Sequence, residues 1–222
     1  MQSDERTDGE ERSQRFEEVS EHDSKSLFKP SVAALVVSNS EAEGPNVMTA
    51  SWWMLGGYAP FRYVLAVSQG EYTHEIIEEN PEFVLAAPST EMSEAFSLCG
   101  NVSGYDLDKI DHLGLETLPG KEIDVPLLAD AVGNVECRVL ESFSFEGITY
   151  YIAGVEAAHV REGMLDGRIL SADADQLAFM GSDWENEDDE YKHRYYVDFD
   201  DEDVKSFPDA AALDGLAKDL KE

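Results

Sequence analysis

The sequence predicts a mainly β protein, built as a closed antiparallel barrel with helices only as short inserts. Two observations support this prediction. Short apolar, β-branched segments recur along the chain and are separated by turns that contain glycine, proline or asparagine. Neighbouring segments are joined by short turns, as in hairpins, and many short strands at regular spacing are typical of a barrel.

The first half of the chain alternates between predicted strands and short polar turns. Residues 31–38 are apolar and β-branched, which predicts a buried strand, and Gly44-Pro45 in the following turn predicts a hairpin. An acidic helix is expected to begin at Thr73 as its N-cap and to end at Asn80-Pro81. The expected elements are strands at 31–38, 46–54, 61–68 and 83–87, turns or loops at 39–45 and 56–60, and helices at 73–80 and 91–99.

The second half contains the strongest hairpin signal. Residues 135–145 and 148–160 both alternate between apolar and polar, and the turn Glu146-Gly147 joins them. Before this hairpin we expect a glycine-containing loop, a helical turn and an extended apolar segment, at 100–108, 109–113 and 125–128. Near the C-terminus, Ser206-Phe207-Pro208 predicts a helix start, and a spacing of three and then four residues predicts a docked helix on Leu213, Leu216 and Leu220.

Composition divides the chain into three parts. Residues 1–24 are polar and acidic without apolar periodicity, which predicts a disordered arm. Residues 25–170 carry the predicted barrel. Residues 171–222 form an acidic extension interrupted by aromatic residues and ending in the predicted helix.

The formal net charge is −32, and it is not confined to the ends of the chain. Residues 25–182 alone carry 24 acidic against 8 basic residues. A surface this acidic repels itself at low salt and stays soluble at high salt, so we expect the surface of a halophilic protein. Because no basic patch can displace counterions from phosphates, nucleic acid is not expected as a partner.

Nothing in the sequence predicts a membrane protein or a secreted one. The apolar runs are short of a membrane span, and the polar N-terminus does not read as a signal peptide. Two cysteines, Cys99 and Cys137, give no disulfide framework and fit a reducing compartment. The expected location is therefore the cytoplasm, without a membrane partner.

The most informative stretch is Asn46–Trp53. As a strand it would place Val47, Thr49, Ser51 and Trp53 on one face. The hydroxyls of Thr49 and Ser51 would then both bind the same oxyanion or ring edge. Ser68 and Tyr72-Thr73-His74 follow, and a helix start with a hydroxyl suits a phosphate. Together they predict a nucleotide-type cofactor site, whereas each segment alone also fits an ordinary core strand or a plain capped helix.

Five segments in order carry a resemblance to a known family. They read NVMTASW, YTHEII, FVLAAP, GNVSGYDLDK and NVECRV, at 46–52, 72–77, 83–88, 100–109 and 134–139. This set resembles the flavin reductase-like family of FMN-binding split barrels, over roughly residues 28–165. The resemblance implies an antiparallel split β-barrel of Greek-key type with short peripheral helices. It also implies a homodimer with FMN bound near the subunit interface.

The resemblance assigns roles to ten residues. It implies that one group lines the flavin ring and ribityl chain, a second holds the phosphate, and a third closes over the site. The residues that would line the ring and ribityl chain are Asn46, Thr49, Ala50, Ser51 and Trp52. Those that would hold the phosphate are Ser68, Tyr72 and Thr73, and those that would close over the site are Ser103 and Gly104.

Two positions depart from the family pattern. Family members often carry a basic residue where this chain has Glu71, so Arg62 or Lys109 would have to balance the phosphate charge. Reductase members often carry a histidine in the late hairpin turn, where this chain has Ile148, and His159 lies at the far end of the same strand. FMN binding is therefore better supported than NAD(P)H use, and no catalytic residue is named.

The histidines and cysteines show no ligand spacing, so no metal site is expected. The main hypothesis is an FMN-dependent oxidoreductase in which NAD(P)H reduces the flavin, which then reduces free flavin, an oxygenase partner or iron. The alternative is an FMN-binding carrier or electron-transfer protein without reductase activity. A third possibility keeps the barrel but binds haem or a deazaflavin.

Overall fold

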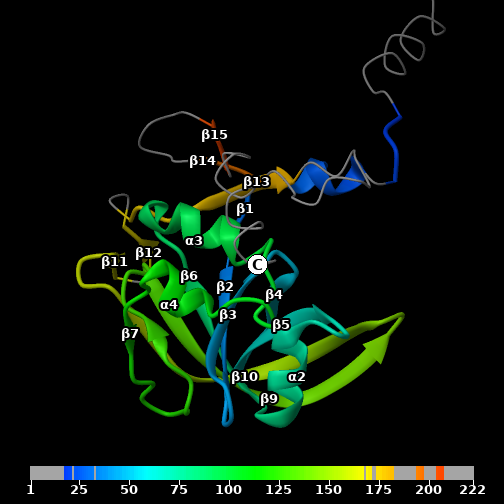
Figure 1. Cartoon of the computed structure of the whole chain (residues 1–222). Coiled ribbons are helices and arrows are strands. Elements are labelled where there is room, and N and C mark those ends of the chain that lie inside the picture. The colour runs from blue at the N-terminus through cyan, green and yellow to red at the C-terminus, as the bar shows by residue number, and fades with distance from the viewer. Residues whose placement is uncertain are drawn as a thin grey trace, which may run out of the picture.

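The computed structural model of the chain (Figure 1) describes residues 18–182, except 22, 33, 168, 172 and 173, together with strands at 194–197 and 204–207. Its main feature is a seven-stranded, wholly antiparallel sheet in the order β3-β2-β6-β9-β10-β5-β4. These strands are β2 Ala34–Ser40, β3 Gly44–Ala50, β4 Trp53–Tyr58, β5 Phe61–Ser68, β6 Glu82–Ala87, β9 Gly133–Phe145 and β10 Ile148–Val160. The prediction of a mainly β, antiparallel protein is confirmed.

Short helices and small sheets surround the large sheet (Figure 1). β1, β13, β14 and β15 form a second, four-stranded sheet, and β7–β8 and β11–β12 form two-stranded sheets. The helices are η1 Asp23–Phe28, α2 Tyr72–Glu79, η2 Thr90–Met92, α3 Ser93–Leu98 and α4 Lys109–Leu113. The remaining strands are β1 Ser31–Val32, β7 Thr117–Leu118, β8 Leu127–Leu128, β11 Leu165–Asp166, β12 Ile169–Leu170, β13 Ala178–Ser182, β14 Arg194–Val197 and β15 Val204–Phe207.

The predicted late hairpin is confirmed. β9 and β10 pair from Ile148↔Phe145 to Val160↔Gly133, and Glu146-Gly147 forms the turn. Both turn residues have positive φ, which glycine accepts readily and which fits the twist of a two-residue hairpin turn. The predicted strand at 61–68 and helical turn at 109–113 are also confirmed, as β5 and α4.

The predicted continuous strand at 46–54 is wrong. β3 ends at Ala50, Ser51 and Trp52 form a bend, and β4 begins at Trp53. The bend resets the side-chain alternation: Val47 packs in one core cluster, whereas Trp53 packs against the other. Ser51 and Trp53 therefore do not continue the face of Val47 and Thr49.

Two neighbouring predictions were also wrong. The expected loop at 56–60 is mostly strand, because β4 runs to Tyr58 and pairs with β5 through a bulge near Gly57. The expected turn at 39–45 is tighter, because β2 extends to Ser40 and β3 already begins at Gly44. A glycine pair and a proline therefore lie inside edge strands, where bulges and missing ladder donors are tolerated.

α2 starts earlier than predicted. Its N-cap is Glu71, whose side chain makes no capping hydrogen bond, and Thr73 lies inside the first turn. Thr73 is 2% exposed and receives a hydrogen bond from Asn46 instead. The predicted end at Asn80 is confirmed as the C-cap.

The two edges of the large sheet approach each other at one corner. Only Ser51 and Trp52 separate β3 at one edge from β4 at the other, so the sheet must curve back on itself there. The Trp52 carbonyl accepts a hydrogen bond from Ala66 N at 2.9 Å, which holds the crossing against β5. Pairing of β3 with β4, which a closed barrel needs, is not among the strand pairs of the described residues.

β2 is buried on both faces because it separates two core clusters. Leu35 and Val37 pack towards α3 and the segment before β9, whereas Ala34 and Val36 pack inside the curved sheet. This explains the continuous apolar run of β2, since a strand covered on both sides needs no polar face.

The ends of the predicted domains are only partly described. Residues 1–17 of the predicted arm, and Leu213, Leu216 and Leu220 of the predicted terminal helix, lie outside the described residues. The predicted helix start at Ser206-Phe207 is wrong, because both residues lie in β15, which pairs with β14. Within the extension, β13 pairs with β1, so this part of the chain contributes strands that the sequence did not predict. None of the described helices has the length and apolar character needed to cross a membrane.

Candidate functional site

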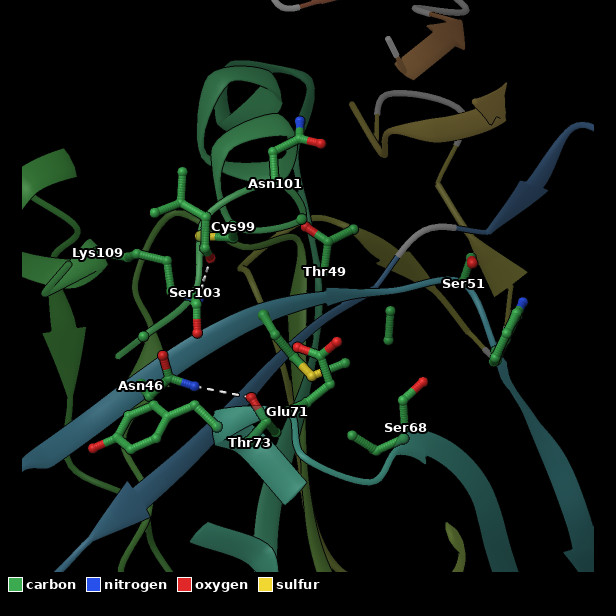
Figure 2. Close-up of a pocket in the computed structure, with 18 of the residues that line it drawn as sticks. Asn46, Thr49, Ser51, Ser68, Glu71, Thr73, Cys99, Asn101, Ser103 and Lys109 are labelled. Atoms are coloured by element: carbon green, nitrogen blue, oxygen red, sulfur yellow. Dashed lines mark hydrogen bonds between the residues drawn. The ribbon is translucent and has the colours of Figure 1, made fainter. Parts of the chain in front are cut away.

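A cavity of about 380 Å³ lies beside the corner where β3 passes into β4. Its walls come from β3 and the bend after it, the end of β5, the start of α2, the loop after α3, and β13 (Figure 2). All ten residues predicted from the sequence line this one cavity: Asn46, Thr49, Ala50, Ser51, Trp52, Ser68, Tyr72, Thr73, Ser103 and Gly104. Segments far apart in sequence therefore converge as the predicted cofactor site requires.

Thr73 and Asn46 form the polar floor of the cavity. Asn46 Nδ2 donates to Thr73 Oγ1 at 2.9 Å, and both side chains are buried (Figure 2). Because the Thr73 oxygen already accepts this bond, its own proton remains available for a ligand. Two N–H groups at the start of α2, those of the wall residues Tyr72 and Thr73, have no partner among the described residues, whereas that of His74 donates to the Glu71 carbonyl at 2.9 Å. This end of the cavity therefore presents hydrogen-bond donors.

Thr49 has the opposite polarity. Its hydroxyl donates to the Phe96 carbonyl, and its backbone N–H donates to the Cys99 carbonyl at 3.2 Å. With its proton committed to Phe96, the Thr49 oxygen can only accept a hydrogen bond from a ligand. The two threonines thus offer a donor and an acceptor from different parts of the cavity wall.

The loop after α3 closes tightly over α2. A Cβ added at Gly104 would lie 2.3 Å from Tyr72 Cδ1 and 2.4 Å from Asn46 Oδ1, so only glycine fits there. Tyr105 packs on Tyr72 with ring centroids 4.7 Å apart, and its backbone N–H donates to Ser103 Oγ at 3.3 Å. The loop thereby places the Ser103 hydroxyl, with its proton available, in the cavity wall.

Lys109 is the one cation among the residues that line the cavity. It begins α4 behind Asp108, which caps that helix, and its side chain is 4% exposed. Its Nζ donates to the Val102 carbonyl at 3.2 Å, which leaves further ammonium protons available. Burial lowers the pKa of Lys109, while Cys99 and Glu71 act in the opposite direction and favour its charged form. Arg62 is not in the wall, and its guanidinium bonds the Pro60 carbonyl at 3.2 Å.

Sequence reasoning missed several apolar wall residues, which are Met48, Ala66, Val67, Val102 and Phe179. Phe179 comes from β13, packs on Phe96 with centroids 5.9 Å apart, and lies under the Lys29 ammonium. It lies after the segments that carry the family resemblance, in a stretch with no strong pattern. Contacts between parts of the chain that are distant in sequence hold it there: β13 pairs with β1, and Leu177 N donates to the Pro88 carbonyl at 3.0 Å.

None of the described histidines, which are His74, His112 and His159, lies in the cavity wall. His74 bonds Thr149 Oγ1 at 3.0 Å, and His159 bonds the buried Glu136 carboxylate at 2.5 Å. Cys137 is buried, and burial raises the pKa of its thiol to about 12, so it is unsuited to act as a nucleophile. In the part of the chain that the structure describes, no group of three or more His, Cys, Asp and Glu side chains is placed to hold a metal ion.

Comparison with known proteins agrees with this geometry. A protein of Archaeoglobus fulgidus, itself uncharacterized, is 33% identical over 58% of this chain and 71% of its own length. Flavoredoxin from Methanosarcina acetivorans is similar in structure, with a TM-score of 0.63, 23% identity, and coverage of 82% of this chain and 87% of that one. An FMN-binding protein from Thermus thermophilus gives a TM-score of 0.66 at 20% identity, covering 81% and 94% of the two chains.

These two solved structures show a shared fold, and the sequence comparison is more specific. The model of the family described as the flavin reductase like domain matches residues 28–183. That range contains both sheet edges, α2, the loop after α3 and Phe179, and hence every wall of the cavity. The chain therefore belongs to the flavin reductase-like family.

Proposed function

We propose that this protein binds FMN in the cavity and acts as a flavin reductase-like oxidoreductase with NAD(P)H as electron donor. The observation that carries the proposal is the polarity of the cavity wall, with donors at the start of α2 and an acceptor at Thr49. An FMN molecule has the matching chemistry, because its phosphate only accepts at neutral pH and its ring edge carries an N–H. When bound, the flavin supplies the acceptance and release of a hydride or of electrons.

The residues at the α2 end would hold the phosphate. The Thr73 hydroxyl and the first N–H groups of the helix donate, the Ser68 hydroxyl lies in the same wall, and Lys109 adds a positive charge. Towards the bend after β3, Ala50, Ser51 and the half-exposed Trp52 offer backbone and an aromatic surface for the ring. No side chain is assigned to proton transfer, since hydride chemistry belongs to the cofactor.

An unpartnered sheet face supports the proposed homodimer. The cross-strand register of β4, β5, β10 and β9 places one set of apolar side chains on the side away from the core. Met54 is 61% exposed and Phe143 is 56% exposed, and Phe143 stacks on Tyr150 with centroids 4.9 Å apart. We define this outer apolar face as Met54, Val64, Ala66, Leu140, Phe143, Tyr150 and Ile152.

The outer apolar face is continuous with the cavity, because Ala66 belongs to both. Large exposed apolar patches mark interaction sites, and a second copy of this face would cover it and shield the neighbouring cavity from water. Phe143→Glu is therefore expected to convert a dimer to a monomer in sedimentation at molar KCl, and to weaken FMN binding. Leu118→Glu, an exposed apolar residue on β7, is the control. A wild-type monomer would contradict the proposed dimer.

The experiment that tests the main proposal is a titration with FMN in molar KCl, followed by NADH or NADPH oxidation. We expect flavin fluorescence to be quenched on binding and NAD(P)H to be oxidised with free flavin, an oxygenase component or ferric iron as the acceptor. A protein that leaves the spectrum of added FMN unchanged would overturn the proposal. Haem or deazaflavin binding would instead give its own absorption spectrum.

A specific observation favours a second candidate function, that of an FMN-binding carrier or electron-transfer protein. The tip of the β9–β10 hairpin carries Ile148, and His159 is held far along β10 by Glu136. The family's turn histidine therefore has no counterpart at this place. Tight FMN binding without NAD(P)H oxidation would select this candidate over the reductase.

The remaining parts of the proposal concern the whole chain. We infer that the curved sheet is a split barrel, that residues 25–170 form its domain, and that 1–24 and 171–222 are extensions, the second of which packs back on the domain through Phe179. We also infer a halophilic protein from the net charge of −32, and a cytoplasmic location from the presence of only two cysteines. Limited proteolysis in molar salt tests the boundaries: cleavage inside β9 or β10 before cleavage near residue 24 would contradict them.

A further inference from the structure

Glu71 is an acidic side chain in the wall of a cavity proposed to bind a phosphate. It is exposed, it occupies the N-cap position of α2, and its carboxylate makes no hydrogen bond to that helix (Figure 2). An acidic N-cap side chain ordinarily accepts from the first-turn N–H groups. Here the carboxylate leaves the N–H groups of Tyr72 and Thr73 to the cavity, and it acts on the site through its charge.

The charges that line the cavity are balanced before any ligand binds. Glu71 and Lys109 are its only acidic and basic side chains among the described wall residues. Glu71 also acts on Lys109, since its charge favours the protonated ammonium. A phosphate monoester brings about −1.5 to −2 charges at neutral pH, so binding makes this part of the wall strongly negative.

From this arrangement, and resting on the proposed flavin site, we propose that Glu71 makes cofactor choice depend on ionic strength. At low ionic strength its carboxylate opposes the phosphate of FMN and leaves riboflavin, whose tail is uncharged, unaffected. At molar salt the Debye length falls to about 3 Å, so the repulsion is screened and FMN binds through its donors. Glu71 is thus a specificity-determining residue that ties FMN retention to the salt concentration.

The test compares the dissociation constants of FMN and riboflavin between about 0.1 M and about 1 M KCl, over which the Debye length falls from about 10 Å to about 3 Å. Sucrose, which is excluded from protein surfaces, keeps the protein folded at the lower salt concentration, and circular dichroism checks the fold. The variants are Glu71→Gln and, as a matched control, Glu94→Gln, which removes an exposed acid from α3 outside the cavity wall.

We expect Glu71→Gln to tighten FMN binding about five- to tenfold at the lower salt concentration, as the Coulomb energy of nearby charges in water predicts. Its effect on riboflavin is expected to stay within about twofold, and its effect on FMN to vanish at the higher concentration. Glu94→Gln changes the field of the whole protein by the same charge but is expected to change the FMN-to-riboflavin ratio by less than about twofold.

A second measurement does not depend on affinity. The ³¹P shift of bound FMN, followed against pH, is expected to show a lower second phosphate pKa in Glu71→Gln than in the wild type, because a nearby negative charge disfavours the dianion. An unchanged phosphate pKa, or equal effects of Glu71→Gln on FMN and riboflavin, would overturn the inference while leaving the flavin site intact. Failure of both flavins to bind would instead overturn the proposed function.

Discussion

The hydrogen bond between Asn46 and Thr73 joins a strand to a helix and also sets the polarity of the cavity floor. In Thr73→Val the buried Asn46 amide loses its acceptor, and the site loses a donor. We expect a loss of about 1–3 kcal/mol in the free energy of unfolding, together with weaker FMN binding. Urea unfolding and FMN titration measure the two effects, and Thr117→Val on the exposed β7 is the control. Unchanged stability would show that Asn46 finds another partner.

The loop after α3 packs closely on α2 because Gly104 has no Cβ. In Gly104→Ala the added Cβ would overlap Tyr72 and Asn46, so the loop after α3 must move. Overpacking of this kind costs about 1–3 kcal/mol, and we expect FMN binding to weaken with it. Gly57→Ala is the control, because its Cβ would meet only ordinary contacts, the nearest at 3.6 Å. Equal FMN affinity in the two variants would contradict a closing role for this loop.

At the scale of elements, a buried carboxylate holds the loop before β8 against the large sheet. Glu136 on β9 accepts the backbone N–H groups of Lys121, Glu122 and Ile123, and it also bonds His159. Burial alone would raise the pKa of Glu136, but these hydrogen bonds outweigh it and hold the pKa below its ordinary value. The charged form therefore stabilises the fold.

The sign of the pH dependence follows from that lowered pKa. The contribution of Glu136 is complete above the pKa of an unfolded glutamate, about 4.3, and is lost as pH falls through the lower folded value. We expect Glu136→Gln to cost about 2 kcal/mol at neutral pH and to flatten the acid side of the stability curve. Glu141→Gln, at an exposed position on the same strand, is the control. If the free energy of unfolding of Glu136→Gln fell with acid pH as steeply as that of the wild type, the account of Glu136 would be contradicted.

The element scale also shows how much of the molecule could be predicted. Local patterns located β5, α4 and the β9–β10 hairpin, because their alternation and turn residues agree with their final environment. The bend at Ser51-Trp52 could not be predicted, since it exists only because the sheet curves and brings β5 alongside. Thr73 has the side chain of an N-cap, but Asn46, distant in sequence, holds it inside the helix.

The candidate site, too, could be predicted where local motifs define it and not where contacts distant in sequence do. Motif segments named ten wall residues that the fold gathers into one cavity. Phe179 was missed because contacts distant in sequence, such as the pairing of β13 with β1 and the bond from Leu177 N to the Pro88 carbonyl, bring it there. Lys109 was considered as a source of charge, and its burial in the wall favours it over Arg62. The one acid among the described wall residues, Glu71, was also noted from the sequence, as a departure from the family pattern.

At the scale of the whole molecule, repulsion among the acidic side chains is expected to determine how stability depends on salt. With a net charge of −32, the native state is expected to weaken as salt is removed, because exposed carboxylates repel one another over a longer Debye length. Thermal melts at increasing KCl are expected to show a rising Tm, and sodium sulfate at equal ionic strength serves to separate screening from exclusion of the salt. A Tm independent of KCl would contradict the halophilic assignment.

The position of Phe179 in the chain has a consequence for how the cofactor is acquired. The residues of the other walls have been made by Lys109, but the sheet joins β5 to β3 only through β2, β6, β9 and β10. These walls therefore come together only after the β9–β10 hairpin has been made, and Phe179 follows later still. At a synthesis rate of about 5–20 residues per second, the proposed flavin site would therefore lack its Phe179 wall for about one to four seconds before β13 arrives. Full affinity for the flavin would then mark the end of synthesis, and a chain that terminates early would be left without its cofactor.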